Sequence, residues 1–210
     1  MNSQPSADPA MRRTVAILLF DDVEVLDFAG PFEVFAVTDE LSDYRLFQVQ
    51  TVAPAPGTVR ARNGLRIVPD HSLATAPAPD ILIVPGGSGS RALLDRSDVL
   101  DWIRSRAPRA EVVASVCTGA RLLARTGLLD GLGATTHHEN IAELAALAPA
   151  ARWMADRRFV DHGRIATSAG ISAGIDLSLH LVARLCSPAI AERTARYMEY
   201  PWRNDGGLRR

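Results

Sequence analysis

Three short, continuous apolar runs constrain the fold of this chain more than any other feature. They lie at residues 14–20 (TVAILLF), 81–84 (ILIV) and 111–116 (EVVASV). Short apolar runs without alternation indicate strands that are buried on both faces, as in a parallel sheet. Helical stretches separate these runs along the chain. The alternation predicts an α/β fold built on a single, doubly wound parallel sheet.

Helical periodicity and turn residues predict the remaining elements. Helices are expected at residues 23–37, 91–106, 120–129, 139–147, 171–185 and 189–198, and further strands at 44–52 and 134–136. We expect Gly30-Pro31 to interrupt the first helical segment, because proline is best tolerated where a helix starts. Two hairpins are expected, one at 59–68 with a type I′ turn at Asn63-Gly64 and one at 158–168 turning at His162-Gly163.

The length of 210 residues favours one domain, since domains usually hold about 100–200 residues. We expect that domain to span residues 14–202, with a disordered leader at 1–13 and a short tail at 203–210. The leader lacks the apolar segment of a secretory signal. No apolar run reaches the roughly 18 residues of a membrane span, so we expect no membrane partner.

Charge and cysteine content exclude several classes of function. The formal net charge is −1 and the 23 basic residues are scattered along the chain, which argues against nucleic acid as a partner. The two cysteines, Cys117 and Cys186, lie far apart and neither has metal-ligand spacing around it. We therefore expect no disulfide framework and no metal, and a reducing cytoplasm as the compartment.

Chemically active residues follow three of the predicted strands, and parallel sheets bind ligands at the carboxyl ends of their strands. Asp27 lies beyond the first strand, Gly86-Gly87 follows 81–84, and Cys117 follows 111–116. Cys117 stands between a strand and a helix, as the nucleophile does in a nucleophile elbow. The start of the following helix should favour its thiolate. Alternatively, Cys117 is a buried, inert cysteine.

The neighbouring candidates also have structural alternatives. Gly86 and Gly87 could bring backbone N–H groups to an oxyanion, or form a simple tight turn. Asp27 could cap a helix, or hold a proton at neutral pH if it is buried near a cysteine. His137 could be a surface residue at a helix start, or could orient or deprotonate a nearby group. We interpret Cys186 as a packing residue.

Several segments together resemble a known family. They are LLFDDVEVLDFAGPFEVF, ILIVPGG, ASVCTGARLLARTGLLDG, ATTHHEN and TSAGISAGIDLSLHLVARL, within residues 14–202. In this order they resemble the DJ-1/PfpI (ThiJ/PfpI) superfamily, and within it the branch that contains isonitrile hydratase. The resemblance implies a flavodoxin-like fold of the class I glutamine amidotransferase type. It also implies a homodimer without a cofactor.

The resemblance assigns roles to three residues in the matching motifs. Cys117, in the VCTG motif, corresponds to the nucleophile, and Thr118 to the threonine that assists it. Asp27, in the LD-x-x-GP motif, corresponds to the essential acid/base carboxylate. Protease-like members of the superfamily carry Cys-His at the nucleophile elbow. The sequence here is Cys117-Thr118, which argues against peptidase activity.

Four further residues are assigned to the surroundings of the nucleophile. Gly86 and Gly87 match glycines that line the active site, and Ile171 matches an isoleucine close to the nucleophile. His137 matches a histidine found near the cysteine in other branches. The glycine-rich run that precedes the isoleucine in characterised hydratases is replaced here by 168–170 (SAG), so the pocket could differ in shape.

The expected activity is the addition of water to an isonitrile, a small-molecule substrate, to give an N-substituted formamide. Two alternatives stay open. One is a glyoxalase or deglycase acting on small dicarbonyls, in which His137 would matter more. The other is a non-catalytic ligand-binding or redox-sensing domain. Regulators of this branch carry a helix-turn-helix module after the sensor domain, and the eight residues beyond Trp202 lead us to expect none.

Overall fold

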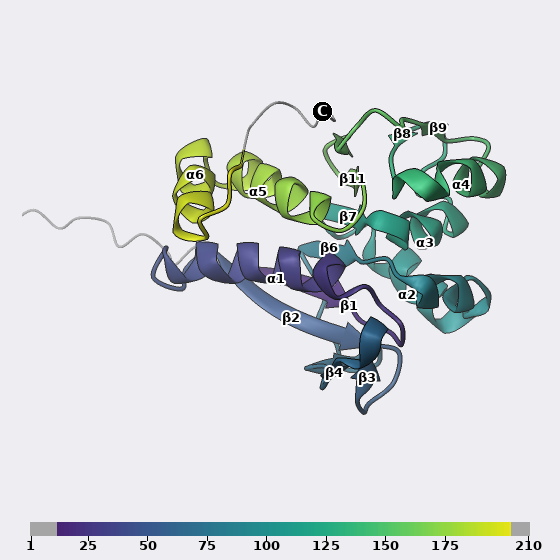
Figure 1. Cartoon of the computed structure of the whole chain (residues 1–210). Helices are drawn as coiled ribbons and strands as arrows, with labels where there is room; N and C mark the ends of the chain where they lie inside the picture. Colours follow the sequence, from purple (N-terminus) through teal and green to yellow (C-terminus); the bar gives the residue numbers. More distant parts are fainter. Residues whose placement is uncertain (1–11, 203–210) are drawn as a thin grey trace, which may run out of the picture.

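A seven-stranded sheet forms the centre of the structure, a computed structural model that describes residues 12–202 (Figure 1). Neighbouring strands are parallel except β10 and β11, which are antiparallel. This arrangement confirms the predicted doubly wound parallel sheet. In spatial order the strands are β10 (Phe159–Asp161), β11 (Ile165–Ser168), β7 (Val112–Val116), β6 (Ile81–Val84), β1 (Arg13–Leu18), β2 (Phe47–Ala53) and β5 (His71–Ser72).

The three apolar runs form the adjacent central strands β1, β6 and β7. Every residue of β6 and β7 is buried, as continuous apolar strands require when helices cover both faces. In the register Val84 lies opposite Ser115, one residue before the end of β7. The two strands therefore deliver the segments after Val84 and Val116 to the same edge of the sheet, which brings Gly86 and Cys117 together.

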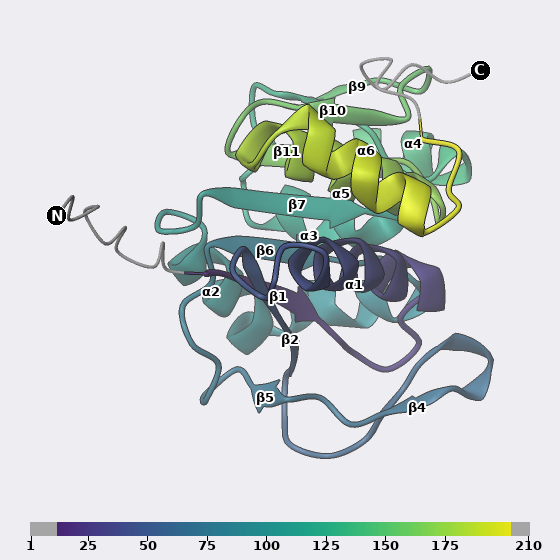
Figure 2. The ribbon, with the colours of Figure 1, turned by 90° about the vertical axis from the view of Figure 1, so that its left-hand side faces the viewer.

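Helices cover both faces of the sheet (Figures 1 and 2). One layer holds α1, α5 and α6, which pack against one another, and the opposite layer holds α2 and α3, with α4 against α3. Their bounds are α1 (Val25–Glu40), α2 (Ser97–Arg106), α3 (Ala120–Arg125), α4 (Ile141–Leu147), α5 (Ala173–Leu185) and α6 (Pro188–Tyr197). No helix within residues 12–202 is both long enough and apolar enough to cross a membrane.

The expected interruption at Gly30-Pro31 is wrong, because α1 runs through Pro31 without a break. The φ that proline imposes is itself helical, and the helix loses only the hydrogen bond that Pro31 cannot donate. Packing of α1 against α5 and α6 stabilises the continuous helix. The expected strand at 134–136 is shorter, since β8 (Gly133–Ala134) pairs with β9 (Arg152–Trp153) outside the main sheet.

Both predicted hairpins are present. β3 (Val59–Arg60) pairs with β4 (Arg66–Ile67), and β10 pairs with β11. Asn63 and Gly64 have positive φ, but the Gly64 N–H donates to the Ala61 carbonyl, so the connection is longer than the expected two-residue turn.

The chain ends lie largely outside the described residues. This applies to residues 1–11 of the expected leader and to the whole of the expected tail. The last two leader residues are ordered parts of the domain, because Arg12 pairs with Asp39 and Arg13 begins β1.

Candidate active site

Cys117 occupies a sharp turn between β7 and α3. It opens a 3₁₀ turn, Cys117–Gly119, and its φ of 56° lies in the left-handed region that non-glycine residues rarely adopt. Two hydrogen bonds hold this conformation: the Cys117 N–H donates to the Ala169 carbonyl at 3.1 Å, and the Thr136 hydroxyl donates to the Cys117 carbonyl at 2.8 Å. Strained backbone of this kind clusters at functional sites, which favours a reactive cysteine over an inert one.

Asp27 lies in the first turn of α1 and is fully buried. It is not a helix cap, because the residue in the N-cap position of α1 is Glu24. Its Oδ2 accepts a hydrogen bond from the Gly86 N–H at 3.0 Å. Its Oδ1 is buried without a conventional hydrogen-bond partner among the described residues. The carboxyl and the Cys117 thiol are close enough for their side chains to interact, as the sequence predicts.

The surroundings raise the pKa values of both groups. Burial raises the pKa of Asp27 to about 7, and the charge of Glu24 adds to this, while the Gly86 N–H opposes it. Burial and then the negative charge of Asp27 raise the pKa of Cys117 to about 12, against the N–H groups of Thr118 and Ile171. The expected raised pKa of Asp27 is confirmed. The expected lowered pKa of Cys117 is wrong, because burial and the ionised carboxyl outweigh the backbone donors.

These two pKa values make the carboxyl and the thiol a coupled pair. Between about pH 7 and pH 12 the pair holds one proton and one negative charge. When the proton is on Asp27, Cys117 is a thiolate beside an acid. The pKa values place this proton mainly on the sulfur, so the pair provides a nucleophile and a proton donor together when the proton moves to Asp27.

Gly86 and Gly87 bring the loop after β6 against this pair. A Cβ at Gly86 would lie 2.5 Å from the Thr118 nitrogen and 2.9 Å from Asp27 Oδ2, so no larger residue fits. The Gly87 N–H donates to Thr118 Oγ1 at 3.0 Å, and the Thr118 hydroxyl faces the Gly87 carbonyl at 3.3 Å. Both glycine N–H groups are thus already engaged, and their oxyanion role stays a prediction. The N–H groups that act on the sulfur belong to Thr118 and Ile171.

Ile171 and His137 both line the pocket at Cys117. Ile171 has a φ of 54° and is 38% exposed. The His137 ring lies against Gly170, where a Cβ would come within 2.2 Å of it. His137 Nδ1 also accepts the Glu139 N–H at 3.4 Å, which caps the 3₁₀ turn His138–Asn140. Cys186, at the end of α5, is half-buried against the core and does not line this pocket.

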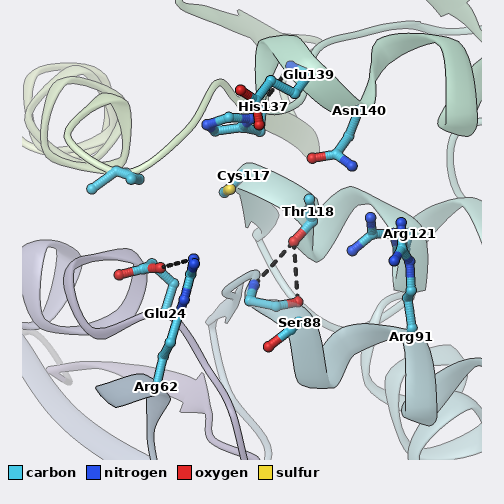
Figure 3. Close-up of a pocket in the computed structure, with 12 residues that line it drawn as sticks. Glu24, Arg62, Ser88, Arg91, Cys117, Thr118, Arg121, His137, Glu139 and Asn140 are labelled. Carbon is cyan, nitrogen blue, oxygen red and sulfur yellow. Dashed lines mark hydrogen bonds and ion pairs between the residues drawn. The ribbon is translucent and has the colours of Figure 1, made fainter.

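The pocket has a volume of about 220 Å³, and Figure 3 shows Cys117 between two sets of polar side chains. Sequence reasoning missed most of them: Glu24, Arg62, Ser88, Arg91, Arg121, Glu139 and Asn140. For two of these residues, their spacing from a predicted site residue in the sequence offered a signal. Arg121 follows Cys117 by four residues and Glu24 precedes Asp27 by three, which are spacings that place helical residues on one face.

Within residues 12–202 no three His, Cys, Asp or Glu side chains gather where they could hold a metal ion. The pocket instead combines a buried thiol with hydrogen-bonding groups, and the buried Asp27 carboxyl interacts with that thiol without lining the pocket. This set is suited to covalent acid/base chemistry on a small molecule.

Comparison with known proteins finds relatives that match most of the chain. The model of the DJ-1/PfpI family matches residues 13–184. An isonitrile hydratase of Pseudomonas putida is 35% identical over 90% of this chain and 79% of its own length. The HTH-type transcriptional regulator GbdR of Pseudomonas aeruginosa is 33% identical over 86% of this chain, which spans about half, 49%, of the regulator.

The fold is shared with solved structures as well. The crystal structure of a ThiJ/PfpI family protein from Pseudomonas syringae matches with a TM-score of 0.82 and 29% identity. The match covers 98% of this chain and 83% of that protein. It confirms the expected flavodoxin-like fold.

Proposed function

The chain belongs to the DJ-1/PfpI family, and we propose that it is a cysteine-dependent enzyme that hydrates isonitriles to N-substituted formamides. The observation that carries the proposal is the buried Asp27 carboxyl beside Cys117, which together hold one proton at neutral pH. Isonitrile hydration needs a nucleophile and a proton donor at the same carbon atom. The similarity to an isonitrile hydratase over 90% of the chain supports the same chemistry.

The first half of the reaction forms a covalent intermediate. The Cys117 thiolate attacks the terminal carbon of R–N≡C and forms a carbon–sulfur bond. The carbon takes the proton from Asp27, which gives the thioimidate R–N=CH–S–Cys117 and leaves Asp27 ionised. The N–H groups of Thr118 and Ile171 stabilise the thiolate before the attack.

The second half returns the enzyme to its starting state. Asp27 removes a proton from water while the oxygen bonds to the thioimidate carbon, and then passes that proton to the nitrogen. Asp27 next takes the hydroxyl proton as the carbon–sulfur bond breaks. The products are R–NH–CHO, the Cys117 thiolate and protonated Asp27, so the net reaction adds one water to one isonitrile.

Formamide production by the purified protein tests this proposal. We expect the wild type to convert isobutyl isonitrile to N-isobutylformamide, measured by chromatography and mass spectrometry. Cys117→Ala should abolish the conversion, whereas Cys186→Ala, a matched change at a cysteine outside the pocket, should leave it unchanged. Absence of Cys117-dependent formamide would overturn the proposal. A parallel assay with methylglyoxal tests the glyoxalase alternative.

A ligand-binding domain without turnover is a second candidate, favoured by the similarity to GbdR. This chain would then bind a small molecule in the same pocket and leave it chemically unchanged. Binding by the wild type, detected calorimetrically, without formation of any product would support this candidate over hydration.

A further inference from the structure

Most residues that line the pocket have polar side chains, although the carbon atoms of these side chains form a large part of its surface. Of the residues described as lining it, Ile171 is the one with a hydrocarbon side chain. Ligand pockets are usually lined mainly by apolar and aromatic side chains, with a few polar groups that give orientation. A hydrocarbon substituent could pack against these carbon atoms, but it would also remove water from the polar groups of the pocket without replacing their hydrogen bonds.

One side of the pocket, which we call the polar wall, consists of Arg91, Arg121 and Asn140. Glu143 fixes all three. Arg121 is 3% exposed and donates from Nε and Nη2 to the two Glu143 carboxylate oxygens at 2.9 and 2.8 Å. Arg91 Nη2 donates to the same carboxylate at 2.8 Å. The hydrogen bonds from the two arginines lower the pKa of Glu143 to about 2, so this carboxylate is charged at neutral pH.

The same carboxylate sets the direction of the Asn140 amide. Asn140 Nδ2 donates to Glu143 Oε2 at 2.9 Å, and a flipped amide would face the carboxylate with its oxygen. Figure 3 shows the result: the Asn140 nitrogen turns toward Arg121 and the oxygen toward the Cys117 side of the pocket. The polar wall therefore presents a fixed acceptor close to arginine donors. This is the pattern that a primary amide complements, with an N–H₂ for Asn140 and a carbonyl for the Arg91 guanidinium.

The charges of the pocket do not favour an anionic ligand. Arg91 and Arg121 share Glu143, and Arg62 on the other side pairs with Glu24 at 3.0 Å. The Asp27–Cys117 pair adds a negative charge at the base of the pocket. One positive charge is left where Arg91 and Arg121 share Glu143, but a carboxylate on the ligand would be repelled by Glu139, which also lines the pocket, and by the Asp27–Cys117 pair next to the reacting carbon.

We propose that the site selects small isonitriles whose side group is neutral and forms hydrogen bonds, with a primary amide as the best match. This inference rests on the proposed function. The preference for small substrates follows from the pocket volume of about 220 Å³, which is below the roughly 300–1,000 Å³ of pockets for drug-sized ligands. Asn140 and Arg91 contact the side group, and Arg121, whose nitrogens already donate to Glu143 and to Ser90 Oγ, holds Glu143 in place. Cys117 and Asp27 act on the isonitrile carbon.

Three isonitriles with the same heavy-atom skeleton test the proposal: 2-isocyanoacetamide, isobutyl isonitrile and isocyanoacetate. We expect kcat/KM to be at least about tenfold higher for the amide than for the isobutyl compound, since two hydrogen bonds distinguish them. Isocyanoacetate should be the poorest substrate. Asn140→Leu should remove most of the preference for the amide while isobutyl isonitrile is still hydrated. Gln48→Leu makes the same kind of change on β2, outside the pocket, and should preserve the preference.

The outcomes separate this inference from the proposed function. If all three compounds are hydrated but isobutyl isonitrile or isocyanoacetate is the best substrate, the proposed selectivity is wrong and the proposed hydration is still supported. Turnover of none would overturn both. A second test uses the wild type alone and measures how strongly the reaction products inhibit it. N-formylglycinamide should inhibit at least about tenfold more strongly than N-isobutylformamide, and equal inhibition would contradict the proposal.

Discussion

Cys117 and Asp27 interact directly: the charge of Asp27 raises the pKa of the thiol, whereas the hydrogen bond from the thiol lowers the pKa of the carboxyl. Hydrogen bonds from the Gly86 N–H, the Cys117 thiol and the Ile171 N–H offset part of the cost of burying Asp27 but do not outweigh it. Burial also penalises the thiolate. A neutral carboxyl would relieve the repulsion and donate to the sulfur. The proton shared by the pair is thus the feature on which the chemistry of this site depends.

Asp27→Asn should separate the reactivity of the thiol from turnover. The variant keeps an acceptor for the Gly86 N–H and removes both the negative charge and the transferable proton. We expect the pKa of Cys117 to fall, because the charge of Asp27 is one of the causes that raise it. Alkylation by iodoacetamide at pH 8 should therefore accelerate, while isonitrile hydration slows by roughly 10²–10⁴-fold. Slower alkylation, or near wild-type hydration, would contradict this account of the pair.

The same substitution should change how stability depends on pH. A carboxyl whose pKa is raised in the folded state contributes stability below its ordinary pKa and loses it as pH rises. For Asp27 this window runs from 3.8 to about 7. We expect the free energy of unfolding of the wild type, relative to Asp27→Asn, to decrease across that window in denaturant titrations. A constant difference between the two proteins would refute the raised pKa.

Gly86→Ala should inactivate the enzyme without unfolding it. The new methyl group would displace Thr118 and the Asp27 carboxyl, which lie 2.5 to 2.9 Å from the Cβ position. We expect at least a 10²-fold loss of kcat, the scale of a misplacement of about 1 Å in an active site. Gly131→Ala is the control, because nothing lies within 4 Å of the added Cβ. Its φ of 76° adds backbone strain that Gly86→Ala lacks, so the control loses at least as much from the backbone alone. Equal activity of the two variants would mean that the Gly86 contact is unimportant.

At the scale of elements, the loop from Ala169 to Ser172 is held against the Cys117 turn by a cluster around Arg158. The Ala169 N–H donates to the Arg158 carbonyl at 2.8 Å, and Ala169 in turn accepts the Cys117 N–H. The Arg158 guanidinium contacts Ser172 Oγ at 3.2 Å and pairs with Asp176 on α5. The Tyr200 hydroxyl, beyond α6, donates to Asp176 at 2.9 Å. Residues remote in sequence therefore fix the loop that carries Ile171.

Tyr200→Phe should weaken the contacts by which the Arg158 cluster holds the loop from Ala169 to Ser172 in place. We expect kcat to fall by roughly tenfold, less than the 10²-fold of a full 1 Å misplacement, because Arg158 and Asp176 stay paired. The pKa of Cys117 should rise, since the Ile171 N–H that lowers it becomes less well placed. Tyr197→Phe changes an exposed tyrosine on α6 and should alter neither quantity. A loss of thermal stability with an unchanged pH profile of alkylation would mean that Tyr200 is only structural.

At the scale of the whole molecule, Glu143 on α4 connects the layer of helices beside the pocket. It receives hydrogen bonds from Arg121 on α3 and from Arg91, in the 3₁₀ segment Ser88–Asp95. Arg121 is buried, and the Glu143 carboxylate replaces the hydrogen bonds to water that its guanidinium loses. The expected homodimer stays a prediction, which light scattering at micromolar concentration would test.

Glu143→Gln should destabilise the fold at neutral pH by about 2–3 kcal/mol, below the 3–5 kcal/mol of a fully buried pair because Glu143 is one-third exposed. A lowered pKa means that the contribution of Glu143 is present above 4.5 and is lost as pH falls toward 2. The difference in free energy of unfolding should therefore shrink below pH 5. Glu111→Gln breaks an exposed pair with Arg13 and should cost much less. Similar effects of both substitutions would contradict the proposed importance of Glu143.

The sequence by itself determined the central sheet and the position of the nucleophile. The runs at 14–20, 81–84 and 111–116 are local patterns of apolar residues, and burial on both faces leaves a parallel sheet as their natural arrangement. Gly86 and Cys117 follow strands of that sheet, so their meeting at one edge follows from topology. The acid role of Asp27 came from the resemblance of its motif to a family.

The tertiary structure decided the direction of the Cys117 pKa, the continuity of α1 and the polarity of the pocket. The pKa depends on burial and on Asp27, which no local pattern places beside the thiol. Pro31 stays helical because α1 packs against distant helices, and packing can override local propensity. The polar wall combines Arg121 of α3 with Asn140, which precedes α4, through a shared carboxylate on Glu143. Side chains from separate elements acquire a common function only once folding brings their charges within a few ångströms, where electrostatic interactions become strong.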